Sequence, residues 1–88
     1  MTDELNNIYN FYEKLVIEYI SRNLSAGKKE PGYLADIACV ALNHLPPRYI
    51  RYEVDMFFYL SPMERKEMED KIEQAVNNAI EFIEANKN

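Results

Sequence analysis

The chain has 88 residues, of which 48% are hydrophobic and 28% are charged, a composition typical of one globular domain and not of a disordered segment. Its formal net charge of −5 argues against binding to a nucleic-acid polymer, because that binding relies on dense Lys and Arg. No apolar run approaches the roughly 20 residues of a membrane span, and the N-terminus lacks the pattern of a signal peptide. We therefore expect a cytoplasmic protein without membrane contact.

Apolar side chains three and four residues apart predict a first amphipathic helix over about residues 3–24. They are Leu5, Ile8, Tyr9, Tyr12, Leu15, Val16, Tyr19 and Ile20. The tyrosines of this helix are expected to be core or dimer contacts and not a stacking platform.

The same spacing predicts a second helix over about residues 32–44. Cys39 on this helix is expected to be a small buried group, and His44 a residue of the helix end. Pro46 and Pro47 must end the helix, because proline disfavours helical geometry in the residue before it.

Apolar and charged residues alternate after the prolines, which predicts a short strand over about residues 50–56. Phe57 and Tyr59 interrupt the alternation, so a helical turn within residues 50–60 remains open. A lone strand leaves its backbone groups unpaired. We therefore expect it to pair with the same strand of a second copy.

Ser61, Pro62 and Glu64 form a strong helix start, with an N-cap, a proline at the first helical position and a capping box. They predict a last helix over about residues 62–85. The predicted fold is a single mainly α domain over residues 1–88, with three to four helices and one short strand after the prolines. A domain of this size is marginal alone, so we expect a dimer.

Residues that carry out catalysis or bind metals are scarce in this sequence. It has no Gly-rich phosphate loop and no nucleophile with a partnered base, and Cys39 and His44 are its single cysteine and histidine. A lone thiolate cannot build a tetrahedral zinc site. We expect neither an enzyme nor a metal cofactor.

The run from Asp36 to Tyr49, DIACVALNHLPPRY, resembles the signature of the ComFB (late competence development) family, and the helices on either side fit its layout. The resemblance implies a small, mostly helical cytoplasmic homodimer, with some members acting as receptors for cyclic dinucleotides. Many members carry a Cys-x-x-Cys pair of a zinc site just before the aspartate. Glu30 and Tyr33 stand at those positions here, so we expect no zinc.

The resemblance makes the residues around the prolines candidates for binding c-di-GMP or c-di-AMP. Guanidinium groups bind phosphates or stack on purines, and aromatic rings stack on bases, while an aspartate and an asparagine read base edges. The candidate ligand-binding residues are Asp36, Asn43, Arg48, Tyr49, Arg51 and Tyr52. Bound ligand would then signal to an unidentified protein partner.

Each candidate also has a structural alternative. The tyrosines suit a core or an interface, and the arginines suit pairing with Glu53, Asp55 or the acidic last helix. Asp36 suits the helix dipole in a first turn, and Asn43 suits a helix cap. The rival function is a ligand-free interaction or scaffold protein in competence or another regulatory pathway. The sequence leaves open which dinucleotide binds and which partner responds.

Overall fold

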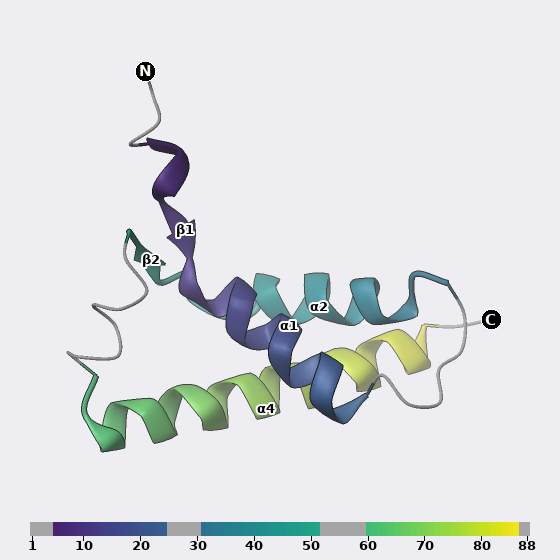
Figure 1. Ribbon diagram of the computed structural model, residues 1–88. Helices are drawn as coiled ribbons and strands as arrows, with labels where there is room; N and C mark the ends of the chain where they lie inside the picture. The colour runs from purple at the N-terminus through teal and green to yellow at the C-terminus, as the bar shows by residue number, and fades with distance from the viewer. Residues whose placement is uncertain (1–4, 25–30, 52–59, 87–88) are drawn as a thin grey trace.

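The computed structural model describes residues 5–24, 31–51 and 60–86, which form three α-helices, one short 3-10 helix and two short strands (Figure 1). In chain order these elements are η1 (Leu5–Asn7), β1 (Tyr9–Asn10), α1 (Phe11–Asn23), α2 (Tyr33–Asn43), β2 (Tyr49–Ile50) and α4 (Pro62–Ala85). The prediction of a small, mainly helical domain is confirmed.

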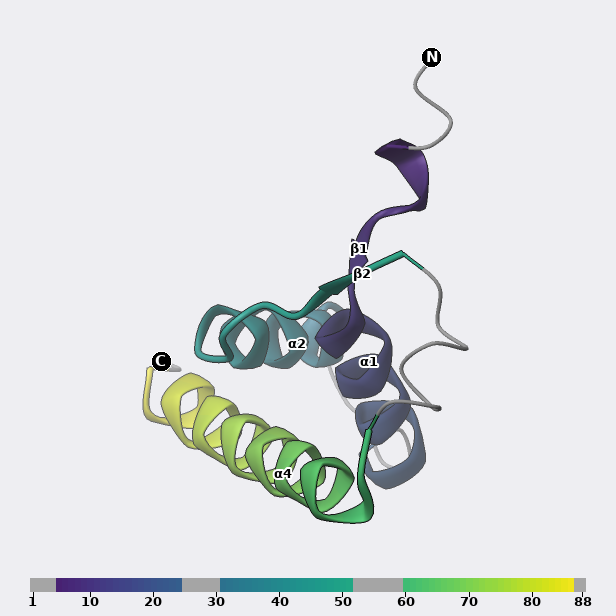
Figure 2. The same cartoon turned by 90° about the vertical axis from the view of Figure 1, so that its left-hand side faces the viewer.

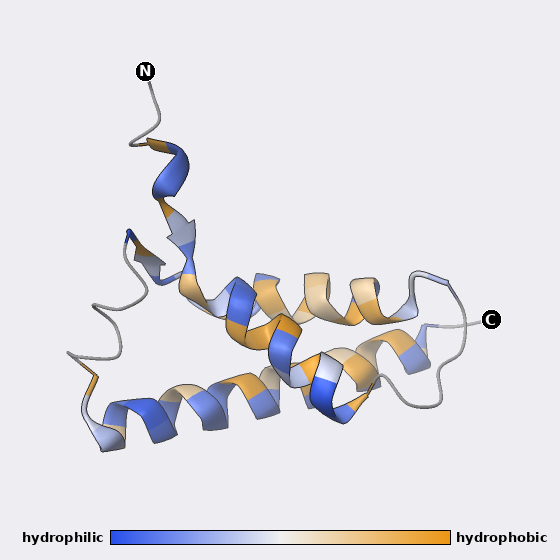
Figure 3. Cartoon of the chain, viewed as in Figure 1, coloured by the Kyte–Doolittle hydropathy of each residue, from blue (hydrophilic) through white to orange (hydrophobic). Residues whose placement is uncertain are grey.

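The three α-helices pack around one apolar core. The most extensive contact joins α2 to α4, and α1 packs against both (Figures 1 and 2). Each helix carries polar and apolar residues in turn along its length (Figure 3). The buried apolar residues are Phe11, Tyr12, Val16, Ile20, Ile37, Ala41, Leu45, Leu60, Met68, Ile72, Ala75, Val76 and Ala79. Within the described ranges, no helix has the length and apolarity needed to cross a membrane.

The first helix begins later than predicted. It starts at Phe11 and not near residue 3, and Leu5 and Ile8 are 65% and 47% exposed. Asn10 has an extended backbone, and its side chain accepts a hydrogen bond from the Tyr12 backbone N–H at 3.2 Å. This N-cap starts the helix at that point, because it satisfies a backbone donor that has no partner inside the helix. Helical spacing of apolar residues upstream was therefore misleading.

The two strands pair with each other inside one chain. Tyr9 lies opposite Ile50, and Asn10 lies opposite Tyr49, in an antiparallel ladder. The premise that the strand after the prolines is a lone strand is thus wrong for β2, and its pairing with a second copy stays a prediction. The partner was missed because residues 9–10 were assigned to the first helix. Predicted strand residues 52–56 lie outside the described part of the chain.

The second helix lies where it was predicted, within a residue at each end. Gly32 precedes it with a φ of 85°, in the left-handed region that glycine adopts at low cost. His44 is the C-cap, so Asn43 is the last helical residue and not the cap. The side of α2 that carries Ile37 and Ala41 enters the core. Cys39, between them, is exposed, so its expected burial is wrong.

The last helix starts and ends as predicted. The Ser61 hydroxyl accepts a hydrogen bond from the Glu64 backbone N–H at 3.1 Å, and the Glu64 carboxylate accepts one from the Ser61 backbone N–H at 2.9 Å. Pro62 occupies the first helical turn, where its missing N–H costs nothing. Near the other end, the Tyr33 hydroxyl donates to Glu84 Oε2 at 2.6 Å. This bond ties the start of α2 to the end of α4.

Candidate functional site

The chain from Leu45 to Arg51, here called the proline corner, is held against the start of α1 by backbone contacts. The Arg48 backbone N–H donates to Asn10 Oδ1 at 2.8 Å, and the Phe11 N–H donates to the Arg48 carbonyl at 2.7 Å. Pairing of β1 with β2 continues this contact. Asn10 therefore serves two elements at once, as the N-cap of α1 and as the anchor of the corner.

The two arginines and the tyrosine of the proline corner are exposed, whereas Leu45 belongs to the core and Ile50 packs against it. Arg48 and Arg51 are exposed, and the Tyr49 side chain is 66% exposed. The alternative of a core tyrosine is therefore wrong for Tyr49, and the alternative of an interface tyrosine stays open. Tyr52 lies outside the described residues. A fixed backbone that carries exposed Arg and Tyr side chains can present charge and an aromatic face to a ligand.

The positive charge of Arg48 acts on the pKa of a titratable side chain in each of two other elements, α1 and α4. Burial raises the pKa of the Tyr12 hydroxyl, and the positive charge of Arg48 partly opposes that rise. The Ser61 backbone N–H holds the pKa of the Glu64 carboxyl below its usual range, and Arg48 adds a smaller lowering effect. Among the described residues, Arg48 forms no ion pair. The guanidinium thus lies in the electrostatic neighbourhood of the starts of α1 and α4 without being neutralised by a described carboxylate.

The two predicted ligand residues of α2 lie apart from each other along the helix. Asp36 is in the first turn and Asn43 is the last helical residue, and both are exposed. Seven residues of helix separate them by about 10 Å along the axis. Because the corner follows the C-terminal end of α2, Asn43 lies near it in the chain and Asp36 lies at the opposite end of the helix. The structure therefore does not gather all the candidates at one place.

The described pockets lie elsewhere. One pocket of about 460 Å³ lies between α1 and α4, and another of about 210 Å³ lies between α1 and α2. Neither is lined by a predicted ligand residue, whether Asp36, Asn43, Arg48, Tyr49 or Arg51. The exposed side chains of Arg48, Tyr49 and Arg51 therefore lie outside both of these pockets.

Sequence reasoning missed the role of Asn10. Its signal was present, because asparagine is among the preferred N-cap residues and Asn10 precedes the apolar pair Phe11-Tyr12. The helical spacing of Leu5 and Ile8 outweighed that signal. Only the contact with Arg48 shows that the cap also positions the corner.

His44 was expected at the helix end, and the structure confirms it. Its Nδ1 lies 2.9 Å from the Val40 carbonyl oxygen of the preceding turn. Within residues 5–24, 31–51 and 60–86, no group of three or more His, Cys, Asp or Glu side chains is arranged to hold a metal ion.

Comparison with known proteins assigns the family. A family model described as late competence development protein ComFB matches residues 9–87. No curated protein and no solved structure matches the chain. The matched range begins at β1 and extends past α4, so it includes the corner and every α-helix described above. The chain therefore belongs to the ComFB family, which associates it with regulation in late competence development.

Proposed function

We propose that this protein is a cytoplasmic regulatory receptor that binds a cyclic dinucleotide, c-di-GMP or c-di-AMP, at the proline corner. It acts as a homodimer, signals to a protein partner and performs no catalysis. The observation that carries the proposal is the adjacent pair Arg48 and Tyr49, exposed on a backbone that is hydrogen-bonded to α1.

The chemistry of this pair suits the two parts of a cyclic dinucleotide. The Arg48 guanidinium offers planar, bidentate donors for a phosphate, and the exposed Tyr49 ring offers a stacking face for a purine. Because β2 and the contact with Asn10 already order the backbone, little further ordering opposes binding. Arg51, two residues further along, adds a second positive charge beside the same surface.

A second copy has a specific place in this proposal. Small-molecule sites bury most of the ligand surface, and the corner of a single copy offers no described pocket. Two corners facing each other would enclose the ligand from both sides. The ligand would then favour the paired arrangement by the difference between its affinities for the two arrangements, which is a population shift that a partner can read.

One observation favours a rival function. Because no described pocket is lined by the candidate residues, the corner also suits a ligand-free surface for protein contact. In that case the protein is a scaffold in a regulatory pathway, and the exposed Tyr49 is a contact residue for a protein.

Titration of the purified protein with c-di-GMP and c-di-AMP, followed by calorimetry, separates the two functions. The receptor proposal expects binding of at least one of them, with Arg48→Ala weakening it by more than about tenfold through the loss of a charge-assisted contact. Light scattering in the same buffer should give the mass of two chains. Absence of binding to both ligands at millimolar concentration would leave the scaffold as the function.

The matched control is Arg22→Ala. Arg22 is an exposed arginine in the last turn of α1, at the end of that helix away from the Asn10 contact. This substitution removes the same charge but should leave the affinity for the dinucleotide within about twofold, because exposed charges beyond a Debye length are screened. An equal loss in both variants would show that the ligand responds to net charge and not to the corner.

A further inference from the structure

The larger described pocket, here called the α1/α4 groove, belongs to a different part of the molecule from the proline corner. It has a volume of about 460 Å³, within the range of binding sites in proteins. Its floor is apolar and is formed by Phe11, Leu15, Tyr19, Leu60, Met68 and Ile72. Leu15 and Tyr19 are half-buried and leave part of this floor open to solvent.

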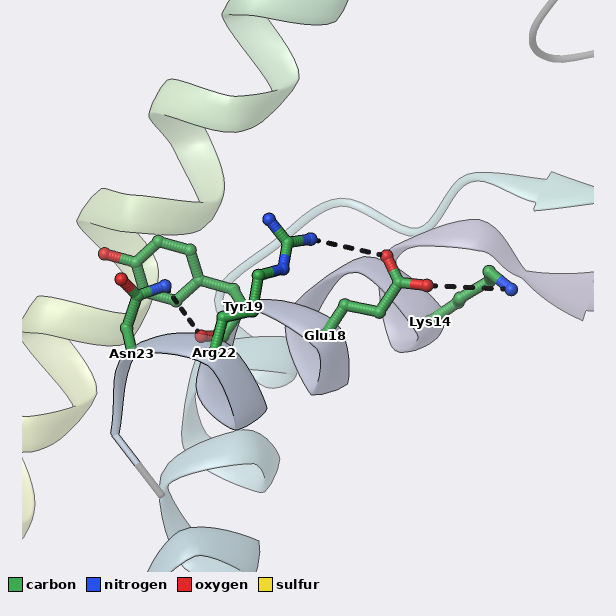
Figure 4. A network of polar contacts seen from close by, with 5 residues as sticks. All are labelled: Lys14, Glu18, Tyr19, Arg22 and Asn23. Atoms are coloured by element: carbon green, nitrogen blue, oxygen red, sulfur yellow. Dashed lines mark hydrogen bonds and ion pairs between the residues drawn. The ribbon is translucent and has the colours of Figure 1, made fainter. Parts of the chain in front are cut away.

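The rim of the groove is charged along both helices. On α1, Glu18 lies between Lys14 and Arg22, 3.7 Å from each (Figure 4). On α4, Lys66 Nζ lies 3.0 Å from the Asp70 carboxylate. The Lys66–Asp70 pair is neutral. Glu18 pairs with two cations, so the α1 group keeps one net positive charge, and Lys14 of this group lies outside the lining of the groove.

Two further carboxylates lie on the α4 wall of the groove. Glu69 and Glu73 are four residues apart and line the groove, and neither forms an ion pair within the described part of the chain. Their effect is seen at Lys66, whose pKa is raised mainly by its hydrogen bond to Asp70 and further by Glu69 and Glu73. Arg65 adds one positive charge at the start of this wall. The middle of the wall is therefore negative.

The dimensions of the groove suit a short helix. The α1 wall extends from Phe11 to Asn23, which is about 18 Å at the helical rise of 1.5 Å per residue. A helix of about 12 residues has the same length and presents apolar anchors at i, i+3, i+4 and i+7, the usual mode of helix-in-groove recognition.

We propose that the α1/α4 groove is a docking site for one amphipathic α-helix of a partner protein, with apolar anchors on the groove floor and Lys or Arg residues facing Glu69 and Glu73. Charge complementarity favours this occupant over a second copy. A second copy carries the same net charge of −5 and the same acidic α4, so like charges would meet. None of the described candidate residues of the proline corner lines the groove, so the two sites use different side chains, although Phe11 lines the groove and its backbone N–H donates to the Arg48 carbonyl.

The probe is a fluorescein-labelled peptide of about 14 residues with Leu at helical a and d positions and Lys at the flanking positions, with a Glu-flanked version of the same peptide as its counterpart. Fluorescence anisotropy in about 0.15 M salt limits long-range attraction, because the Debye length there is about 8 Å. The Lys peptide should bind at least about tenfold more tightly than the Glu peptide. Equal affinity for both peptides would overturn the proposal.

A matched pair of double variants locates the site. Glu69→Lys with Glu73→Lys reverses two charges of the groove, whereas Glu67→Lys with Glu81→Lys reverses two exposed charges of α4 that do not line it. The first variant should weaken binding of the Lys peptide by more than about tenfold, and the second by less than about threefold. Equal losses would mean nonspecific attraction to an acidic protein, and no loss in either would place the peptide elsewhere.

Two further measurements keep the result interpretable. Circular dichroism checks that both variants fold, as expected for substitutions of exposed residues. Light scattering without peptide tests the other occupant: a change of mass in the groove variant alone would assign the groove to a second copy and overturn the proposal. Binding of c-di-GMP or c-di-AMP at the corner should be the same in both variants, so failure here is distinct from failure of the receptor proposal.

Discussion

Different kinds of contact form the proline corner and the α1/α4 groove. At the corner, backbone hydrogen bonds to Asn10 and Phe11 fix the chain, and the side chains of Arg48 and Tyr49 remain exposed. In the groove, side chains form the walls and floor, and the charges on α1 pair along one helix. Among the described residues, the domain thus presents exposed side chains on an ordered backbone at one place and a pocket with a charged rim at another.

The two regions share one support, the buried core, and replacing Ile37 by Ala tests it with the largest expected effect. Ile37 is 0% exposed on α2, so the truncation leaves a cavity and should lower the free energy of unfolding by about 2–5 kcal/mol in a urea titration. Leu5→Ala is the control, because Leu5 is 65% exposed and its loss should cost less than about 0.5 kcal/mol. Similar costs for the two variants would contradict the packing described above.

Replacing Asn10 by Ala should separate the two regions. The substitution removes the acceptor for the backbone N–H groups of Tyr12 and Arg48, so the free energy of unfolding should fall by about 1–2 kcal/mol. Dinucleotide binding at the corner should weaken most, while the affinity for the Lys peptide changes less, because only Phe11 at the capped end of α1 is shared with the groove. Asn86→Ala, which removes an exposed hydrogen bond to the Phe82 carbonyl, is the control for both readouts. An equal loss of dinucleotide binding and of Lys-peptide binding would mean that Asn10 supports both regions alike.

The smallest effect concerns the start of α4 and depends on pH. The Glu64 pKa is lower in the folded chain than its usual value of about 4.3, mainly because the carboxylate accepts a hydrogen bond from the Ser61 N–H. A carboxyl whose pKa is lowered by folding stabilises the folded chain fully at a pH above its pKa in the unfolded chain. That stabilisation is lost as the pH falls through its pKa in the folded chain. The melting temperature of the wild type should therefore exceed that of Glu64→Gln at pH 7, with the difference shrinking below about pH 4. A difference in melting temperature that grows as the pH falls would contradict a lowered pKa of Glu64.

Local chemistry made several elements predictable. Ser61, Pro62 and Glu64 form their capping box within four residues, so no distant contact was needed to predict the start of α4. The prolines likewise require α2 to end just before them, whatever packs around it. The helical spacing of apolar residues predicted α2 to within one residue at each end for the same reason.

The candidate site was predictable as a set of residues but not as an arrangement. Arg48, Tyr49 and Arg51 lie within four consecutive residues, and all three are exposed at the proline corner. Asp36 belongs to the same sequence signature, yet it lies in the first turn of α2, the turn furthest from the corner. A linear motif shows which residues occur together in sequence, whereas the rise of a helix separates its two ends in space.

The sequence by itself determined where α2 ends and where α4 begins, because those outcomes depend on neighbours within a few residues. The start of α1 at Phe11 had a local signal in its N-cap Asn10, whereas only the tertiary structure decided that Tyr9 pairs with Ile50 and Asn10 with Tyr49. The apolar residues upstream of Asn10 have helical spacing, but residues 9–10 form backbone hydrogen bonds with a strand about 40 residues away. Reasoning from neighbouring residues alone does not include such bonds. The α1/α4 groove has the same origin, since its two walls come from opposite ends of the chain.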